Sequence, residues 1–306
     1  MTPGAKLKAK KPKSHLDRAN AFDWINGVLL SLVAVIMFFP FYYTVIVSFA
    51  TYGGIVHSNL YVLPVTFSLE AYEHIFKGSG FIIQSFFVSV FITLTGTILS
   101  MIASVGLAYG ASKTQAPFTR GIMIFVVFTM FFSAGLIPYY LTVKEVGLVD
   151  SVGVMLFPML ISAFNIILLR NYFLSVEPAL EESARIDGAN DLQILIKVIL
   201  PISAPIMATI SLFYAVDRWN EWWHPYMFIM TPSKRPLQLV LREILFKYMQ
   251  VVSSPLGRSI REASRPVYTR TLQMAVVVLS AVPIMMCYPY LQKHFTKGLM
   301  LGSVKG

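Results

Sequence analysis

The sequence predicts an all-α integral membrane protein with six transmembrane helices. Of its 306 residues, 56% are hydrophobic and 13% are charged, and the charged share is about half of that in ordinary soluble domains. In addition, six long stretches contain no Asp, Glu, Lys or Arg at all. A soluble protein of this length needs more charge to cover its surface, so lipid is the simplest solvent for these stretches.

Each charge-free stretch is close to the roughly twenty residues that cross a hydrocarbon core. The stretches are 24–69, 78–112, 121–143, 151–169, 198–216 and 271–292. They predict a transmembrane domain over 24–292, with spans at 24–49, 81–111, 120–142, 152–174, 200–229 and 271–292. The first stretch is too long for one helix, and its tail contains Gly53, Gly54 and Pro64, which are typical of an external loop.

The N-terminal tail, residues 1–23, is basic and directly precedes the first span. Its lysines are Lys6, Lys8, Lys10, Lys11 and Lys13. Basic residues beside a span mark the cytoplasmic face, and an even number of spans places the C-terminal tail, 293–306, on the same side. The first apolar stretch is too long for a signal peptide, so we expect it to be retained. These features predict a multi-pass protein of the cytoplasmic (inner) membrane with both termini in the cytoplasm.

Charge counts support this orientation only weakly. With the N-terminus inside, 14 Lys and Arg lie in the tails and inner loops, against 10 in the outer loops. The net charge of +10 could suggest a nucleic-acid partner, but the lysine cluster of the tail directly precedes a span, as basic residues of a cytoplasmic membrane face do, so we expect none.

Two features describe how the spans meet. Small residues recur at every fourth position of the second span, at Gly96, Ser100, Ser104 and Ala108. Such a face lets another helix approach closely in lipid, and we expect packing within the chain rather than between subunits. Prolines also interrupt several spans, either as the helix breaks common in transporters or as simple kinks. They are Pro40, Pro138, Pro158, Pro205, Pro283 and Pro289.

Residues 177–197, between the fourth and fifth spans, predict a cytoplasmic hairpin of two short helices. Pro178 suits the first turn of a helix, and Gly188 suits the left-handed residue that ends one. Asn190 and Gln193 predict a capping box for the second helix. Ser183, Ala184, Gly188 and Ala189 are small, so we expect one bare surface on which a partner docks.

At these residues the chain resembles the permease subunits of ATP-binding-cassette (ABC) importers. Their cytoplasmic signature is Glu-Ala-Ala, three residues, Gly, nine residues, Ile, one residue and Leu-Pro. Glu182-Ser183-Ala184, Gly188 and Leu200-Pro201 match it at full spacing. Ser183 and Val198 are mild departures. Trp219-Asn220-Glu221 and the terminus 298–306 resemble the carbohydrate-uptake branch, which includes the maltose permeases.

The resemblance implies a type I importer architecture in which the hairpin couples the spans to an ATPase. The implied coupling residues are Glu182, Ser183, Ala184, Arg185, Asp187, Gly188, Ala189, Leu200 and Pro201. The implied partners are a second permease in a heterodimer, an ABC ATPase dimer, an extracytoplasmic solute-binding protein and a sugar. In related permeases the C-terminal tail reaches the ATPases, which makes Gly302, Ser303 and Gly306 candidate contacts.

No catalytic or metal site is predicted in this chain. The phosphate-binding pattern Gly-x-x-x-x-Gly-Lys-Ser/Thr is absent, so ATP and Mg²⁺ are expected in the partner ATPases. Neither zinc-spaced His and Cys residues nor a catalytic Ser, His and Asp grouping stands out. A single cysteine, Cys287, excludes an intramolecular disulfide.

The fifth span contains an ionisable and aromatic cluster, with candidate substrate-path residues Arg218, Trp219, Asn220, Glu221 and Trp222. Charges at this depth usually face the protein interior. One interpretation is an interfacial aromatic belt with Arg218 neutralised by Asp217 or Glu221. The other is an outer vestibule in which the aromatic rings stack on sugars. We favour the belt.

The external segment 231–270 has eight Lys and Arg against two Glu. Its apolar residues recur at helical spacing, at Leu237, Leu241, Ile244, Leu245, Tyr248, Met249 and Val252. This predicts an amphipathic helix on the outer surface, in contact with membrane lipid or a partner subunit. A positive outer mouth would also attract an anionic, polysaccharide-derived sugar.

Two other functions fit part of this sequence. An ion-coupled secondary transporter would explain the spans, the helix breaks and the buried charges, but not the hairpin signature. A membrane scaffold or sensor without cargo would not need coupling to ATP. The sequence therefore favours an importer permease that carries a sugar or oligosaccharide into the cytoplasm by alternating access.

Overall fold

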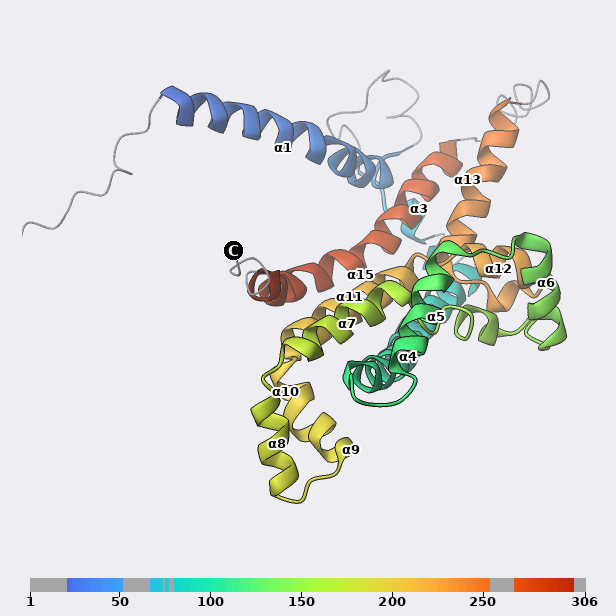
Figure 1. Ribbon diagram of the computed structural model, residues 1–306. Helices are drawn as coiled ribbons and strands as arrows, with labels where there is room; N and C mark the ends of the chain where they lie inside the picture. The colour runs from blue at the N-terminus through green and yellow to red at the C-terminus, as the bar shows by residue number, and fades with distance from the viewer. Residues whose placement is uncertain (1–20, 52–66, 74, 77–79, 254–266, 300–306) are drawn as a thin grey trace, which may run out of the picture.

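The computed structural model describes residues 21–51, 67–73, 75–76, 80–253 and 267–299. Across these ranges the chain is helical, with turns and one isolated β-bridge between Ala50 and Phe67 (Figure 1). The α-helices are α1 (Ala21–Ser48), α3 (Glu70–Glu73), α4 (Gly80–Ser112), α5 (Thr119–Phe131), α6 (Leu136–Glu145), α7 (Ala163–Ser175), α8 (Pro178–Ile186), α9 (Asp191–Ile194), α10 (Leu200–Ile202), α11 (Ala204–Trp219), α12 (Trp223–Phe228), α13 (Leu237–Ser253) and α15 (Val267–Leu299). Shorter segments are η2 (Val152–Met155), the π-helical η3 (Leu195–Ile199) and η4 (Pro232–Lys234).

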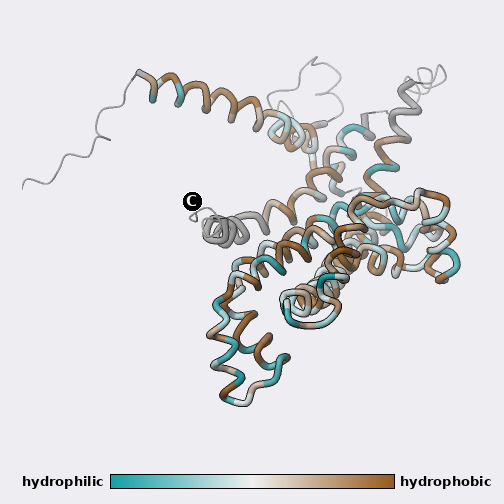
Figure 2. Tube along the Cα trace, in the orientation of Figure 1, coloured by the Kyte–Doolittle hydropathy of each residue, from teal (hydrophilic) through white to brown (hydrophobic). Residues whose placement is uncertain are grey.

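Two of the described helices are long and apolar enough to cross a bilayer, Phe22–Ser48 in α1 and Phe81–Ser112 in α4. A third crossing follows if Asp191–Ile202 and Ala204–Phe228, which meet at 88°, count as one span. Helix α1 packs against α15, while most of its side chains are exposed. They are also mostly apolar, as the brown colour of α1 in Figure 2 shows. Such a surface is stable only in lipid or against another apolar surface.

Helix α4 is the centre of the fold, because both α7 and α11 pack against it. Its small residues form this contact. Ser100, Ser104 and Ala108 are fully buried, and the Ser104 hydroxyl lies 2.6 Å from the hydroxyl of Tyr214 in α11. The prediction that this face packs within the chain is therefore confirmed.

The third and fourth apolar stretches are not single continuous helices, in contrast to the sequence-based expectation. The helix over 120–142 is interrupted at residues 132–135, between α5 and α6, where Gly135 has a φ of +85° that favours glycine. The segment 152–174 begins as the η2 turn, and regular helix starts only at Ala163 in α7. A count of charge-free residues does not report such breaks, because the broken segments contain no charged residue either.

The fifth stretch contains a corner and a break. The corner is at Ser203, where α9, η3 and α10 turn by 88° into α11 and α12. The break separates α11 from α12 at Asn220, Glu221 and Trp222. The cluster singled out in the sequence thus lies where regular helix ends rather than inside a continuous span.

Helix α13 packs on the protein instead of lying free on a lipid surface. Leu237, Val240 and Leu241 are buried in a cluster that includes residues of α11 and α15. The expectation that its apolar side contacts lipid or a partner is wrong for these residues, which contact the chain's own helices. The side chains of Tyr248, Met249 and Val252 lie outside the described residues.

Candidate functional site

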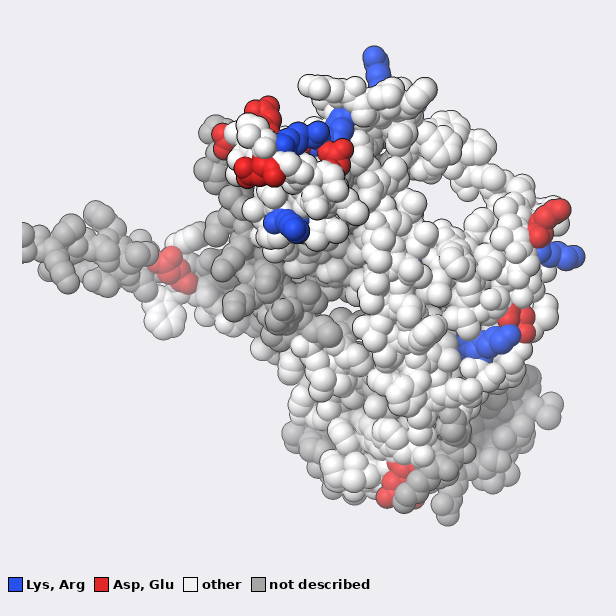
Figure 3. Space-filling view, turned by 90° about the horizontal axis from the view of Figure 1, so that it is seen from below, with Lys and Arg blue, Asp and Glu red and all other residues white. Residues whose placement is uncertain are grey.

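The predicted hairpin is formed by α8 and α9 and projects from the helical body (Figure 1). In the view from the hairpin's end of the molecule, acidic and basic side chains gather at one place, while most of the described surface around them is uncharged (Figure 3). Helix α8 has no buried residue. This end of the molecule is therefore suited to water and a polar partner rather than to lipid.

Both ends of the hairpin's turn are defined by backbone geometry. Helix α8 ends in a Schellman motif: the N–H of Gly188 donates to the carbonyl of Arg185 at 3.0 Å, and that of Ala189 to the carbonyl of Ala184 at 3.0 Å. Gly188 has a φ of +83°. Asn190 and Gln193 then form the predicted capping box of α9. The local geometry read from the sequence is confirmed.

The small residues of the hairpin do not form one bare surface. Ser183 and Gly188 are exposed, whereas Ala184 and Ala189 are partly buried against the core cluster of α4, α7 and α11. Exposed apolar side chains, Ile186 and Leu192, flank the turn instead. The outward surface available to a partner consists of charged residues around Ser183 and Gly188, including Glu182, Arg185 and Asp187, together with these apolar side chains.

Two ion pairs connect the hairpin. Lys113, which follows α4 directly, pairs with Glu181 of α8, and Lys113 also lies over the ring of Tyr109 at 4.2 Å from its centroid. Arg185 of α8 pairs with Asp191 of α9. Leu200 and Pro201 form α10, which leads into α11. The hairpin is thus attached to α4 by an ion pair and to α11 by continuous chain.

Arg218, near the end of α11, is the largest fully buried side chain, with 2% of its surface exposed. Its guanidinium donates to the carbonyls of Met155 and Met159, the latter at 2.6 Å, and to the Ser100 hydroxyl at 3.0 Å. Met155 and Met159 belong to the irregular start of the fourth apolar stretch. Arg218 therefore joins α11, α4 and that segment.

The expected ion pair of Arg218 with Asp217 or Glu221 does not form. Within the described ranges, no carboxylate lies within ion-pair distance of Arg218, and Asp217 is exposed. Glu221 contacts His224 instead, at 3.1 Å from Nδ1 and 2.8 Å from the backbone N–H. Asp217 and Glu221 were expected to face Arg218 because they are one and three positions away in the sequence. Helix α11 ends at Trp219, however, and the guanidinium of Arg218 instead donates to the carbonyls of Met155 and Met159 in the irregular segment before α7.

The other candidate substrate-path residues lie in different environments. Trp219 is buried and donates through Nε1 to the carbonyl of Ser280 in α15 at 2.9 Å. Asn220 is exposed and donates to the carbonyl of Val216. Trp222 lies under Arg242 of α13, whose guanidinium carbon is 3.5 Å from the ring centroid. Only Asn220 and Trp222 thus belong to the surface of this chain.

Comparison with known proteins identifies the family. A permease of the polygalacturonan/rhamnogalacturonan transport system of Bacillus subtilis, YtcP, is 43% identical and is covered over 98% of its length by 93% of this chain. Protein LplC of the same organism is 38% identical, over 93% of this chain and 95% of that protein. This chain belongs to the permease subunits of ABC carbohydrate importers.

A solved structure extends this assignment to three dimensions. A chain from a bacterial ABC transporter involved in the import of the acidic polysaccharide alginate is 33% identical, with a TM-score of 0.81 over 90% of this permease and 96% of that chain. No protein-family model matches the sequence. The permease is accordingly an integral membrane, non-enzymatic transport subunit, and permeases of this family work with a second permease, an ATPase and a binding protein. Ion-coupled transport is not favoured.

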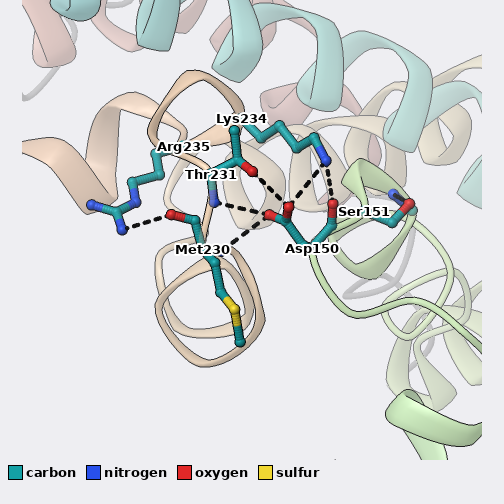
Figure 4. A network of polar contacts seen from close by, with 7 residues as sticks. Asp150, Ser151, Met230, Thr231, Lys234 and Arg235 are labelled. Atoms are coloured by element: carbon teal, nitrogen blue, oxygen red, sulfur yellow. Dashed lines mark hydrogen bonds and ion pairs between the residues drawn. The ribbon is translucent and has the colours of Figure 1, made fainter.

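Asp150 ties two loops of the permease together (Figure 4). Its carboxylate accepts from the backbone N–H groups of Met230 and Thr231 at 3.1 and 3.0 Å, and from the Thr231 hydroxyl at 2.6 Å. Lys234 pairs with it at 3.3 Å. The hydrogen bonds from Thr231, supported by those from Lys234 and Met230, hold the pKa of Asp150 well below its usual range.

The sequence reasoning missed Asp150, Lys113 and Lys234 as parts of the site. Lys113 and Asp150 border charge-free stretches and were counted only as limits of spans, and Lys234 was counted only among the basic residues of 231–270. A rule that pairs opposite charges across loops would have been needed to find them. The coupling residues all lie within the described ranges. The proposed tail contacts Gly302, Ser303 and Gly306, and the basic tail 1–20, lie outside the described residues. Among the described residues, no group of three or more His, Cys, Asp and Glu is placed to hold a metal ion.

Proposed function

We propose that this permease forms half of the membrane pathway of an ATP-driven importer and that the hairpin 177–197 receives the movement of the ATPases. The observation that carries the proposal is the projecting α8–α9 turn with left-handed Gly188. This hairpin is attached both to α4, by the Lys113–Glu181 pair, and to α11, through α10. A partner that shifts this turn would act on both central helices. This mechanism requires only that the two ATPase states favour different packings of those helices.

The proposed orientation places the hairpin in the cytoplasm and α13 outside. The N–H of Leu237, at the start of α13, donates to the Ser89 hydroxyl of α4, whereas Lys113 meets the hairpin. At 1.5 Å per residue, about 36 Å of helix separate Ser89 from Lys113, which exceeds a hydrocarbon core of about 30 Å. These two contacts therefore fit opposite faces of one bilayer. The segments α5–α6 and η2–α7 complete six crossings in this proposal, and both termini lie in the cytoplasm.

The proposed partners follow from the exposed surfaces. Apolar side chains such as Trp24, Leu32 and Phe38 of α1 are more than half exposed, which suits lipid together with a second permease. The hairpin suits an ATPase dimer, which supplies ATP and Mg²⁺. A solute-binding protein would dock on the outer face, where Asp150 joins two loops. The C-terminal residues Gly302, Ser303 and Gly306 remain proposed contacts of the ATPases.

We also propose an acidic oligosaccharide as the cargo. Two relatives support this choice by their names, one for polygalacturonan and rhamnogalacturonan and one for alginate. On this chain, Trp222 and exposed Tyr226 have ring centroids 6.3 Å apart, and Arg242 stacks on Trp222. No acceptor among the described residues engages the Arg242 guanidinium. Rings that pack on sugar faces beside an arginine that pairs with a carboxylate would suit a uronic acid.

The coupling proposal is tested by Gly188 variants in the reconstituted complex with loaded binding protein. Gly188→Asn tolerates the left-handed backbone and adds a neutral side chain, whereas Gly188→Asp adds a negative charge of nearly the same size. We expect Gly188→Asp to lose most of the stimulated ATP hydrolysis and Gly188→Asn to lose less. Complex assembly is measured in parallel. Unchanged stimulation by an intact Gly188→Asp complex would show that the hairpin is structural and would overturn the proposal.

The cargo proposal is tested by uptake in proteoliposomes, with oligogalacturonate competing against a neutral oligosaccharide of equal length. We expect Arg242→Gln to lower the preference for the acidic sugar by about tenfold, the scale of one charge-assisted hydrogen bond. Arg235→Gln is not a suitable control because Arg235 pairs with Glu243. Lys144→Gln removes an exposed charge that pairs with no carboxylate in the described ranges. Preferential uptake of the neutral sugar by the wild type would refute the assignment.

A further inference from the structure

A cavity of about 420 Å³ opens beside the turn between α4 and α5, bounded by α5 and α7. It lies at the hairpin's end of the molecule, because Lys113 of the same turn pairs with Glu181 of α8. Its lining divides into two parts. Arg120 and Arg170, with Thr114 and Thr119, form a polar end. Met123, Ile124 and Val127 form an apolar wall.

The polar end is positively charged and already held in position. The Nε of Arg170 donates to the carbonyl of Ala111 in the last turn of α4, at 2.8 Å. Within the described ranges, its two terminal nitrogens have no acceptor, and Arg120 is exposed and has none either. The nearby carboxylate of Glu181 is taken by Lys113. An anion at this end would therefore meet two guanidinium groups without a competing protein carboxylate.

The apolar wall extends away from that positive end along α5. From Arg120 to Val127 the helix rises about 10 Å, and Ile124 and Val127 are 61% and 39% exposed. A free inorganic anion would make no use of this wall. A molecule with a phosphate at one end and a hydrocarbon chain at the other would occupy both parts.

We infer that this cavity binds an anionic phospholipid of the cytoplasmic leaflet, with its phosphate between Arg120 and Arg170 and an acyl chain along Met123, Ile124 and Val127. The inference rests on the orientation in the proposed function, which places this end at the inner membrane surface. Basic pockets at that depth suit acidic headgroups. Thr119, in the lining, donates to the carbonyls of Lys113 and Ala116 at 3.1 and 2.9 Å. The lipid thus stabilises the turn that carries the ion pair to the hairpin.

Native mass spectrometry of the full complex tests this inference, with phosphatidylglycerol and phosphatidylcholine of identical chains added in equal amounts. We expect the wild type to retain phosphatidylglycerol preferentially and Arg120→Gln to lower that preference about fivefold, the effect of one basic residue at an anionic surface. Lys197→Gln is the matched control, because it removes an exposed charge of η3 outside the cavity. Equal retention of both lipids, or equal effects of the two variants, would overturn the inference.

Photocrosslinking identifies the occupant directly. With p-benzoylphenylalanine in place of Ile124, an adduct with phosphatidylglycerol supports the inference, whereas an adduct with the ATPase or the second permease shows that a protein covers the wall and overturns it. Displacement of the lipid by excess inorganic phosphate would likewise assign the arginines to a soluble anion. None of these readouts uses ATP hydrolysis, so a complex that hydrolyses normally but retains no lipid refutes this inference and leaves the coupling proposal standing.

Discussion

Gly96→Ala is expected to destabilise the permease through Arg218. A Cβ atom at Gly96 would lie 3.0 Å from Nε, 3.1 Å from Cδ and 3.3 Å from Cγ of Arg218. The arginine must therefore move by roughly half an ångström to reach ordinary contact distance of about 3.5 Å. It is not free to do so, because its terminal nitrogens bind Met155, Met159 and Ser100 at fixed positions on two other segments.

The magnitude follows from two opposing effects. Overpacking a well-filled site costs about 1–3 kcal/mol, and replacing glycine by alanine inside a helix gains about 1 kcal/mol. Gly106→Ala provides the matched control, since it lies in the same helix and its Cβ would meet nothing within 4 Å. The propensity gain cancels between the two variants, so Gly96→Ala should be less stable than Gly106→Ala by about 1–3 kcal/mol.

Equilibrium unfolding in mixed micelles, titrated with denaturing detergent and followed by tryptophan fluorescence, measures this difference in the free energy of unfolding. A double-mutant cycle with Arg218→Ala isolates the contact, because alanine lacks the Cγ, Cδ and Nε atoms that a Cβ at Gly96 would approach, so Gly96→Ala should then cost nothing. Equal stability of Gly96→Ala and Gly106→Ala, or an unchanged penalty in the Arg218→Ala background, would refute the proposed clash.

Three further predictions follow from contacts described above. Lys113→Met should reduce binding-protein-stimulated ATP hydrolysis about two- to fivefold, because the partly exposed pair with Glu181 contributes up to about 1 kcal/mol; Glu181→Gln should match it, and the double variant should add little in the same assay. Tyr214→Phe should lower the free energy of unfolding by about 1–3 kcal/mol, because it removes the oxygen that hydrogen-bonds to the Ser104 hydroxyl and to the N–H of Ser162. Ser211→Ala, elsewhere on α11, is the control, and an equal loss of stability in the two variants would contradict the assignment. Because the pKa of Asp150 is depressed in the folded protein, its contribution to stability is complete above the unfolded pKa of about 4 and is lost as the pH falls below that value. The difference in melting temperature between wild type and Asp150→Asn should therefore be constant from pH 7 to 5 and shrink toward pH 3. A difference that grows on acidification would show that the charged carboxylate does not stabilise the fold.

Local patterns in the sequence predicted local structure well. Pro178, Gly188 and the Asn190–Gln193 capping box were each read from rules that involve only a few neighbouring residues, and the structure has all of them. The spacing of Gly96, Ser100, Ser104 and Ala108 similarly predicted close packing, since a small-residue face has one physical use in lipid. The importer permease family was identified from the same hairpin.

Partners distant in sequence were not predictable in this way. Arg218 was assigned to Asp217 or Glu221 because these were the nearest opposite charges, but its acceptors are main-chain carbonyls of Met155 and Met159, which exist only because that segment is not helical. The same limitation applies to α13, whose Leu237, Val240 and Leu241 pack in a cluster with residues of α11 and α15 rather than against lipid. An apolar pattern predicts that a helix face is buried, but it does not indicate whether lipid, a partner subunit or another helix of the same chain covers that face.

The corner at Ser203 divides the fifth apolar segment into two helical arms that lie nearly at right angles. One arm, Asp191–Ile202, is about 18 Å long and meets the second arm, Ala204–Phe228, at 88°. Helix α11, the first part of the second arm, is about 24 Å long. In the proposed coupling, a corner that moves as one body would turn a displacement of the hairpin into a displacement of Arg218 at right angles to it, enlarged by about one third.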